Sequence, residues 1–419
     1  MKIIYLHQYF TTPQMSGGTR SYEIARRLVQ AGHEVHMVTS WCKDDGRSSG
    51  WFTTEEAGIK VHWLPVPYSN HMSYGERIWA FGRFAFLSMR KAKELRGEVI
   101  FATSTPLTIA IPAVFSARKR KVPIVFEVRD LWPELPIAIG ALRNFFTKWF
   151  AHRLEYWAYK NSEAVIALSP GMKEGVIRAG YPAERIAVIP NSSDNFEFSY
   201  SVQAEIQFRA ERAWLQDRPL LVYCGTFGRI NGVDYMVSLA KELQSINPEI
   251  RILLIGEGQE KLNIRQQATQ TGVLDVNLFI EESLPKNQMP ALLSAADMAS
   301  SLFIDLPEMQ SNSANKFFDA LASGTPILLN YGGWQHELLQ AKGCGLAMWR
   351  KPINKVAQEV AAKMTDSRWV VQAGKAARKL AEMEFDRDKL AIQFGAVIMA
   401  SADRQGWRAE DIAPGQYNA

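Results

Sequence analysis

The chain has few of the residues that build disulfides and zinc sites. Its 419 residues include seven histidines and three cysteines, Cys42, Cys224 and Cys344. The cysteines form no CxxC pair, and the histidines show no HxH or HxxxH spacing. The pattern therefore argues against a disulfide framework and the common zinc motifs, and a reducing compartment is the simplest interpretation.

A strong net charge and a long apolar span are also lacking. The net charge is +5 and the sequence pI is about 8.9, too mild a basic excess to predict nucleic acid as a partner. The longest uncharged run, residues 99–117, is interrupted by TSTP, which predicts a strand and a separate helix rather than a membrane span. The opening MKIIYLHQYF is typical of a strand and not of a signal peptide.

What the sequence does contain is a repeated strand–helix pattern. KIIYLHQYF predicts a strand, a helix with Ile24 and Leu28 on one face stops at Gly32, and EVHMVTS predicts a second strand. The pattern restarts near residue 218 with PLLVYCG, a glycine loop, VDYMVSLAKELQS and RILLIGEG. Near-continuous apolar strands of this kind indicate parallel sheets that are covered on both faces.

We therefore predict an α/β chain with two doubly wound, Rossmann-like domains, residues 1–191 and 192–385. The polar segment PNSSDNFEF marks their joint, and a helical tail over about 386–419 is expected to pack back on the first domain. In such sheets ligands bind beyond the carboxyl ends of the strands. The loops that follow strands, facing one cleft, are thus the expected place of the functional residues.

The loop GTFGRING, residues 225–232, is the first candidate. Its glycines, Gly228 among them, would let backbone amides approach a phosphate, and Arg229 offers a planar guanidinium to the same group. The alternative is an ordinary turn with a solvated arginine. A second glycine loop, GEGQEK with Gly256, follows the next strand but is a weaker signal.

The stretch SNSANKFFDALASGTPIL is the second candidate. It predicts a helix that begins near Ser313 or Asn315, with Lys316 in its first turn. A cation is unfavourable at the electropositive start of a helix unless an anion binds there. Asp319, one turn further on, could accept hydrogen bonds from sugar or ribose hydroxyls. The alternative is a solvated lysine and an aspartate that complements the helix dipole.

The first domain offers two further loops. PIVFEVRDLWPE predicts a strand that ends at Arg129 and Asp130, and Asp130 could orient or deprotonate an acceptor hydroxyl, although an internal ion pair or helix cap is the alternative. The loop with Gly17, Gly18 and Arg20 could approach a diphosphate. It is not GxGxxG, and the second strand does not end in an acid, which argues against NAD binding.

These motifs together resemble a family-4 glycosyltransferase of the GT-B fold over nearly the whole chain. GGTRSYEIARRLVQAGHEVHMVT, PNSSDN, GTFGRINGVD, LIGEG and KFFDALASGTPIL stand in the family's order and approximate spacing. HQYFTTPQMSGGTRSYEIARRLV and EVRDLWPE resemble the branch of O-antigen and capsule assembly, which includes N-acetyl-L-fucosamine transferases. The resemblance implies retaining transfer without a metal or other cofactor. The donor would be a nucleotide sugar, here UDP-linked, and the acceptor a polyprenyl-diphosphate-linked saccharide.

The resemblance also assigns roles to residues. It implies that residues 1–191 bind the acceptor and 192–385 the donor, with Arg229 and Lys316 at the donor phosphates. Together with Asp130, which is expected from its place at a strand end, these are the predicted catalytic residues. The basic residue that follows the family's arginine is Asn231 here, and the first acid of its paired motif falls on Ser311, for which Glu308 is a candidate substitute. The donor-binding residues implied are Gly17, Gly18, Arg20, Gly228, Arg229, Gly256, Asn315, Lys316 and Asp319.

Two stretches of the first domain, residues 75–97 and 140–161, alternate aromatic with basic residues at helical spacing. They predict contact with an anionic membrane surface, and hence a cytoplasmic protein peripheral to the inner face of the membrane. The alternative is a pair of core helices with basic outer faces. One competing function is a nucleotide-sugar epimerase of the same architecture. Another is a non-catalytic nucleotide-binding subunit, and the presence of Arg229, Lys316 and Asp130 argues against this second alternative. The aromatic residues that predict membrane contact in the two stretches 75–97 and 140–161 are Trp79, Phe81, Phe84, Phe86, Phe145, Phe146, Trp149 and Phe150.

Overall fold

Two separate sheets organise the chain, one in each half. The division places Met1–Pro190 and the described residues from Asp388 on in unit 1, and Asn191–Arg387 in unit 2. The boundaries expected at residues 191 and 386 lie beside these divisions. The structure is a computed structural model that describes residues 1–15, 17–42, 46, 50–66, 72, 74–104, 106–403 and 408–413.

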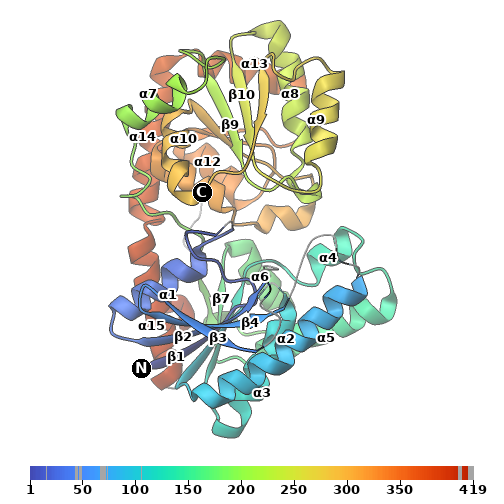
Figure 1. Ribbon diagram of the computed structural model, residues 1–419, viewed down its shortest axis with the longest axis vertical. Coiled ribbons are helices and arrows are strands. Elements are labelled where there is room, and N and C mark those ends of the chain that lie inside the picture. The colour runs from blue at the N-terminus through green and yellow to red at the C-terminus, as the bar shows by residue number, and fades with distance from the viewer. Residues whose placement is uncertain are drawn as a thin grey trace. The chain divides into compact units, whose positions relative to one another are not determined.

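The sheet of unit 1 is built from apolar runs that are buried on both faces, and Figure 1 shows helices on either side of this sheet. Its described part has eight strands in the order β3-β4-β2-β1-β5-β6-β7-β8, all parallel except for the pair β3 and β4. The strand order reverses between β1 and β5, where sheets of this kind bind ligands. The strands are β1 (Lys2–Leu6), β2 (Glu34–Trp41), β3 (Phe52–Glu56), β4 (Ile59–Pro65), β5 (Val99–Thr103), β6 (Ile124–Val128), β7 (Ala164–Ala167) and β8 (Ile186–Val188).

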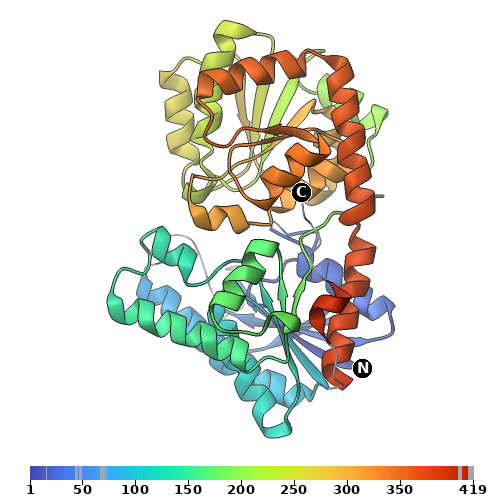
Figure 2. The same ribbon diagram turned by 180° about the vertical axis from the view of Figure 1, so that it is seen from behind.

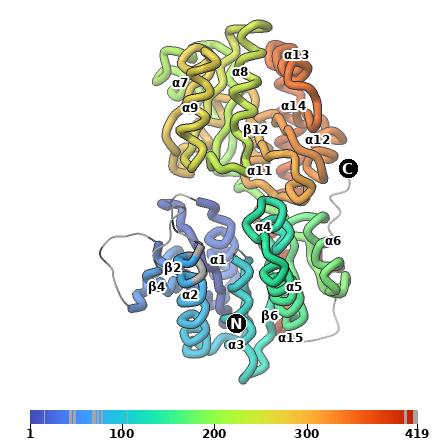
Figure 3. The backbone as a smooth tube through the Cα atoms, turned by 90° about the vertical axis from the view of Figure 1, so that its right-hand side faces the viewer, coloured from blue at the N-terminus to red at the C-terminus, as the bar shows by residue number. Residues whose placement is uncertain are grey.

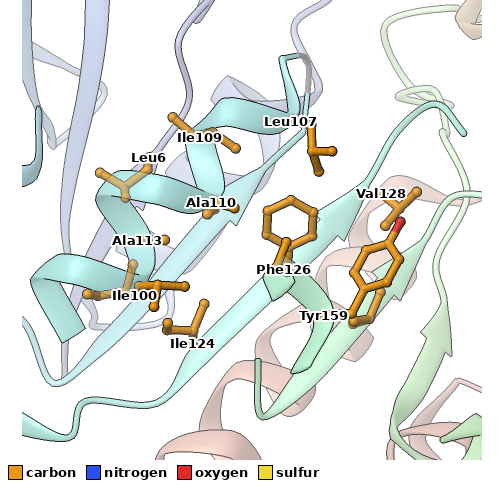
Figure 4. Packing of buried hydrophobic residues seen from close by; sticks show 14 of the residues in the cluster. Leu6, Ile100, Leu107, Ile109, Ala110, Ala113, Ile124, Phe126, Val128 and Tyr159 are labelled. Carbon is orange, nitrogen blue, oxygen red and sulfur yellow. The ribbon is translucent and has the colours of Figure 1, made fainter. Parts of the chain in front are cut away.

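Alternate residues of each strand pack against two helical layers. In β1, Ile4 belongs to the cluster that includes α2, α3, α5 and α6, whereas Ile3 belongs to the cluster with α1, α15 and α16. Figure 4 shows part of the first cluster, in which the ring of Phe126 lies 6.0 Å from that of Tyr159. The helices are α1 (Arg20–Gln30), α2 (Tyr74–Leu95), α3 (Ala110–Ala117), α4 (Glu134–Ala138), α5 (Phe145–Lys160), α6 (Pro170–Arg178), α15 (Arg387–Asp403) and α16 (Ala409–Ile412).

The C-terminal helices complete the core of unit 1. Phe394 of α15 is fully buried, and its ring centroid lies 4.8 Å from that of Phe101 in β5. Leu390 and Val397 join the same cluster. Figure 2 shows α15, drawn in red, beside this sheet.

Unit 2 repeats the architecture with a smaller sheet. In the described residues its strand order is β11-β10-β9-β12-β13-β14, all parallel, and the order reverses between β9 and β12. Helices α8, α9 and α13 share one buried cluster with the sheet. The strands are β9 (Leu220–Cys224), β10 (Arg251–Ile255), β11 (Leu278–Glu281), β12 (Met298–Ser301), β13 (Ile327–Leu329) and β14 (Gly345–Ala347).

Helix α11 follows β12 along the chain (Figure 3) and packs against α14, so its ends are held by the unit's own core. Short 3-10 turns, η4 (Arg229–Asn231) and η6 (Pro307–Ser311), precede α8 and α11. The helices of unit 2 are α7 (Val202–Ala210), α8 (Asp234–Ile246), α9 (Lys261–Gln270), α10 (Met289–Ala295), α11 (Asn315–Ser323), α12 (Trp334–Lys342), α13 (Ile353–Met364) and α14 (Ser367–Glu384).

The α/β fold class with two parallel, Rossmann-like sheets is confirmed. The uncharged run over residues 99–117 splits into β5 and α3 as expected, and no helix in the described ranges is long and apolar enough to cross a membrane. The antiparallel pair β3 and β4 and the edge strand β14 were not predicted.

Candidate functional site

Lys316 lies in the first turn of α11, as the sequence predicts. Its Nζ donates a hydrogen bond of 3.1 Å to the hydroxyl of Tyr223 and lies 4.3 Å from the centroid of that ring. Burial lowers the pKa of the ammonium to about 8, while the nearby Cys224 acts in the opposite direction. The residue that precedes the helix is Ala314, which has no side chain to cap the first amides. A cation and uncapped amides therefore share this helix start.

Two glycine loops lie directly beside Lys316. The amide of Gly225 donates to the carbonyl of Ile255 over 3.0 Å, which joins the loop after β9 to the loop after β10. A Cβ on Gly256 would lie 1.8 Å from the Gly225 carbonyl oxygen, and one on Gly225 would lie 2.9 Å from Lys316 Nζ. Only glycine permits this approach. Gly256 was expected at the site, whereas Gly225 was missed although it begins the GTFGRING loop.

Arg229 begins η4, directly after Gly228, and is exposed. Within the ranges the structure describes, its guanidinium makes no hydrogen bond or ion pair. A Cβ on Gly228 would lie 2.9 Å from Oδ1 of Asn231, so this turn is also tight. The guanidinium is thus available to an anionic ligand, as the sequence-based hypothesis requires.

The carboxylates of the site have different surroundings. Asp319 is partly buried one turn after Asn315, and burial raises the pKa of its carboxyl while Lys286 and Arg387 oppose that rise. Glu308 in η6 has a buried Oε2 without a hydrogen-bond partner among the described residues. That orphaned oxygen fits the expectation that Glu308 replaces the acid missing at position 311, which stays a prediction.

Cys224, at the end of β9, is a neutral thiol. Burial raises its pKa to about 12, with Lys316 lowering and Asp319 raising it. A thiolate is the reactive form of cysteine. Cys224 is therefore a packing residue beside Lys316 and no nucleophile, as expected from the sequence.

In unit 1, polar residues gather where strands β1, β5 and β6 end. Asp130 and Arg129 follow β6 directly, and the Arg129 amide donates to Oγ of Ser104 over 2.9 Å. Arg129 Nη1 lies 3.3 Å from Nε2 of His7, which follows β1. Burial lowers the pKa of His7 well below its usual value, so a neutral imidazole accepts from Arg129. His7 and Ser104 were missed, although both directly follow strands.

The loop with Gly17 and Gly18 is exposed after β1, and Oγ1 of Thr11 donates to the Gly18 carbonyl over 2.9 Å. The φ of +137° at Gly17 lies in a region that favours glycine. This geometry leaves the loop open to a ligand. Its contact with a donor diphosphate stays a prediction.

Arg20 differs from the prediction that it binds the donor. It is only 6% exposed, and it pairs with the fully buried Glu127 at 2.9 Å. The same guanidinium donates to the carbonyls of Ile189 and Pro190 over 2.8 and 2.6 Å. Arg20 therefore joins α1 to β6 and to the chain after β8, and its role is structural.

The two aromatic and basic stretches also differ from each other. In α2, Phe84 is buried in the core, whereas Trp79 and Phe86 are exposed. The side chain of Arg77 lies outside the described residues. In α5, by contrast, four aromatic side chains are 57–75% exposed: Phe145, Phe146, Trp149 and Phe150. The surface hypothesis thus fits α5 fully and α2 in part.

Both halves of the chain match glycosyltransferase families. Residues 17–192 match the Glycosyl transferase 4-like domain, and residues 205–380 match the Glycosyl transferases group 1. The chain belongs to the family-4 glycosyltransferases. Among the residues that the structure describes in this enzyme, no three His, Cys, Asp or Glu side chains gather to hold a metal ion.

The glycosyltransferase is similar to named proteins over most of its length. It is 22% identical over 392 residues to the GDP-mannose-dependent alpha-(1-6)-phosphatidylinositol monomannoside mannosyltransferase of Mycobacterium tuberculosis, covering 90% of this chain and 94% of the relative. An uncharacterized glycosyltransferase of Methanocaldococcus jannaschii is 22% identical over 219 residues, 51% of this chain, and the match spans about half (54%) of that relative.

Solved structures share the fold at low identity. Sucrose-phosphate synthase from Thermosynechococcus elongatus has a TM-score of 0.77 at 15% identity, over 96% of this chain and 100% of that one. Anabaena HepE in complex with UDP-glucose has a TM-score of 0.72 at 16% identity, with the same coverage. These likenesses give the GT-B fold, and the comparisons give no support to the alternative of an epimerase.

Proposed function

We propose that the enzyme transfers a sugar, with retention, from a nucleotide-diphosphate sugar to a lipid-linked saccharide. The observation that carries the proposal is the grouping of Lys316, Gly225 and Gly256 beside the start of α11. This grouping offers an ammonium, close backbone and uncapped amides to one diphosphate. Arg229 supplies a second cation from the loop after β9.

The reaction needs charge stabilisation at the leaving group. As the bond between the anomeric carbon and the diphosphate oxygen breaks, the diphosphate gains negative charge, which Lys316, Arg229 and the α11 amides stabilise. The acceptor oxygen forms its new bond on the same face of the sugar. Its proton passes to the departing phosphate oxygen, so atoms and charge balance without an enzyme nucleophile. Asp130 orients the acceptor hydroxyl.

In this scheme Lys316 and Arg229 stabilise the leaving-group charge that a metal ion would otherwise stabilise. Removal of metal ions by a chelator tests the scheme. Product formation is measured in excess EDTA, with and without added Mg²⁺ or Mn²⁺. We expect turnover to be the same in all three conditions. A loss in EDTA that either metal restores would refute metal-independent transfer, whereas the anomeric configuration of the product tests retention separately.

The donor is proposed to be UDP-linked, and the sugar N-acetyl-L-fucosamine. The support is the likeness to Anabaena HepE, whose complex contains UDP-glucose, and the motifs of the O-antigen and capsule branch. A panel of UDP-, GDP- and dTDP-sugars is compared by thermal unfolding. A ligand at a hundred times its Kd adds about 2.7 kcal/mol to the unfolding free energy. The UDP-sugars should give the largest rise in Tm, and a larger rise with GDP-mannose would overturn the UDP assignment.

The acceptor is proposed to be a polyprenyl-diphosphate-linked saccharide of O-antigen or capsule biosynthesis, reached at the inner face of the cytoplasmic membrane. The support is the exposed aromatic face of α5, in which Phe145 is 74% and Phe146 75% exposed. Arg143 and Arg153 are exposed on the same stretch. Aromatic insertion together with about 1 kcal/mol per basic residue near anionic lipid would give reversible binding.

Co-sedimentation with anionic vesicles tests this surface. Replacing Phe145, Phe146, Trp149 and Phe150 with serine should abolish binding without unfolding the chain, because these side chains are exposed. The matched control replaces two exposed apolar residues of unit 2, Phe196 and Leu262, which are 93% and 76% exposed. Equal loss in the control, or a wild-type chain that stays in the supernatant at low salt, would refute membrane docking through α5.

A further inference from the structure

Unit 2 contains a pocket at the amino-terminal ends of its sheet strands. The cavity has a volume of about 540 Å³, within the range of small-molecule sites. Asp297 and Pro326, which directly precede β12 and β13, line it together with residues of α7 and α14. The site around Lys316 and Gly225 lies where strands end. Because the strands are parallel, the pocket lies at their amino-terminal ends and the Lys316 site at their carboxyl-terminal ends.

One wall is a fixed network of charged side chains. Arg209 lies 3.2 Å from a carboxylate oxygen of Glu205 and 3.2 Å from one of Asp297, and it donates to the Ala295 carbonyl over 2.6 Å. Asp297 also accepts from the Leu220 amide over 2.8 Å. The network is held by the fold before any ligand binds. Its oxygens can still accept, and its nitrogens donate, at the cavity surface.

An aromatic ring and apolar side chains complete the lining. Tyr200 is 56% exposed, and its hydroxyl donates to Glu205 over 2.6 Å, which fixes the ring at the rim. Val370, Val371 and Pro326 provide further apolar lining. Such a ring offers a flat apolar face beside polar partners.

The charges of the pocket favour a neutral ligand over an anion. Helices α10 and α11 both end at the cavity, at Ala295 and Ser323, and helix C-termini carry partial negative charge. Glu205 and Asp297 add two carboxylates. The two arginines of the lining are already engaged, because Arg209 binds both carboxylates and Arg378 binds Glu382 and the Ala322 carbonyl. Lys375, which also lines the cavity, is exposed to solvent. A ligand with hydroxyls that both donate and accept, and with one apolar ring face, matches this lining.

We infer that this pocket is a second ligand site of unit 2, for a neutral saccharide of one or two rings, separate from the candidate donor site. The inference rests on the lining of the pocket and does not depend on the proposed transfer reaction. The saccharide ring stacks on Tyr200, and its hydroxyls bind the partly exposed network of Arg209, Glu205 and Asp297.

Saturation-transfer NMR on the full chain tests the site with glucose, N-acetylglucosamine, rhamnose and cellobiose as probes. At least one should bind with a Kd no weaker than about 10 mM, and excess UDP should not displace it. Tyr200→Ala should weaken binding at least tenfold, equivalent to about 1.4 kcal/mol. Phe196→Ala, at a more exposed ring of the same segment, is the matched control and should leave binding unchanged.

Val371→Trp provides a second variant, because a larger side chain at this lining position should fill part of the cavity while Tyr200 is retained. Thermal unfolding shows that each variant is folded. Absence of binding by all four saccharides would overturn the inference. So would binding that survives both Tyr200→Ala and Val371→Trp, or that UDP or inorganic phosphate displaces.

Discussion

Lys316→Met should reduce the affinity for a nucleotide diphosphate and also remove its dependence on pH. Methionine keeps the apolar stem against Tyr223 but removes the ammonium that lies beside Gly225. A hydrogen bond to a charged group contributes about 1.5–3 kcal/mol, so the Kd at pH 7 should rise roughly ten- to more than a hundredfold. Calorimetric titration with UDP measures this change, and Lys379→Met on the exposed face of α14 is the matched control.

The pH dependence follows from the lowered pKa of about 8. With that pKa the protonated fraction falls about tenfold between pH 7 and 9, so the wild-type Kd should rise about tenfold, or about 1.4 kcal/mol. The unfolding free energy should rise over the same pH range in which the affinity for the ligand falls. Because the folded pKa lies below that of the unfolded chain, the unfolded state binds more protons above about pH 8 and stability rises with pH there.

Titration of the nucleobase is the same in wild type and Lys316→Met, so the difference between them isolates the lysine. A wild-type Kd that stays constant from pH 7 to 9 would refute the role of the ammonium. An unchanged pH slope in Lys316→Met would do the same. Either result would leave Lys316 as a structural partner of Tyr223 with no role in ligand binding.

Three further substitutions separate binding, chemistry and folding. Arg229→Ala should lower turnover by roughly two to three decades while the melting temperature stays unchanged, because the side chain is exposed; near-normal steady-state rates would contradict its role. Asp130→Asn should lower turnover and leave the calorimetric Kd for UDP unchanged, and equal losses of both would assign Asp130 to the donor instead. Arg20→Ala should cost about 3–5 kcal/mol in chemical denaturation because it leaves Glu127 buried without its cation. A stable Arg20→Ala protein with weakened UDP affinity would restore the phosphate-binding role of Arg20.

The sequence predicts the sheets well because their strands are buried on both faces. The runs that become β1, β5, β6, β9 and β10 are almost wholly apolar, so their periodicity leaves little ambiguity. The pair β3 and β4 is different. Strand β3 alternates half-buried and exposed positions, FTTEE, and that short polar pattern resembles a loop. The three-residue strand β14 is too short to carry a period.

The local placement of site residues was predicted correctly where a residue type was unusual for its position, although their roles in binding stay predictions. Lys316 at a helix start and Arg229 between glycines are such cases. Prediction failed for Arg20, because nothing local shows that Glu127, far along the chain, is buried opposite it. Gly225 was also missed, since its necessity arises from the approach of Gly256 in three dimensions. Long-range partners, rather than local propensity, decide these positions.

The placement of α15 has a consequence for synthesis on the ribosome. Unit 1 contains both ends of the described chain, and one face of its core needs Phe394 and its neighbours, which emerge after all of unit 2. Domains generally fold as they emerge, the N-terminal one first. In this chain the first 190 residues have a sheet face that α1 covers only in part until α15 emerges, whereas Asn191–Arg387 are contiguous and can fold earlier. Stalling or truncation before residue 388 would therefore leave the nascent chain with a folded second half and an aggregation-prone first half.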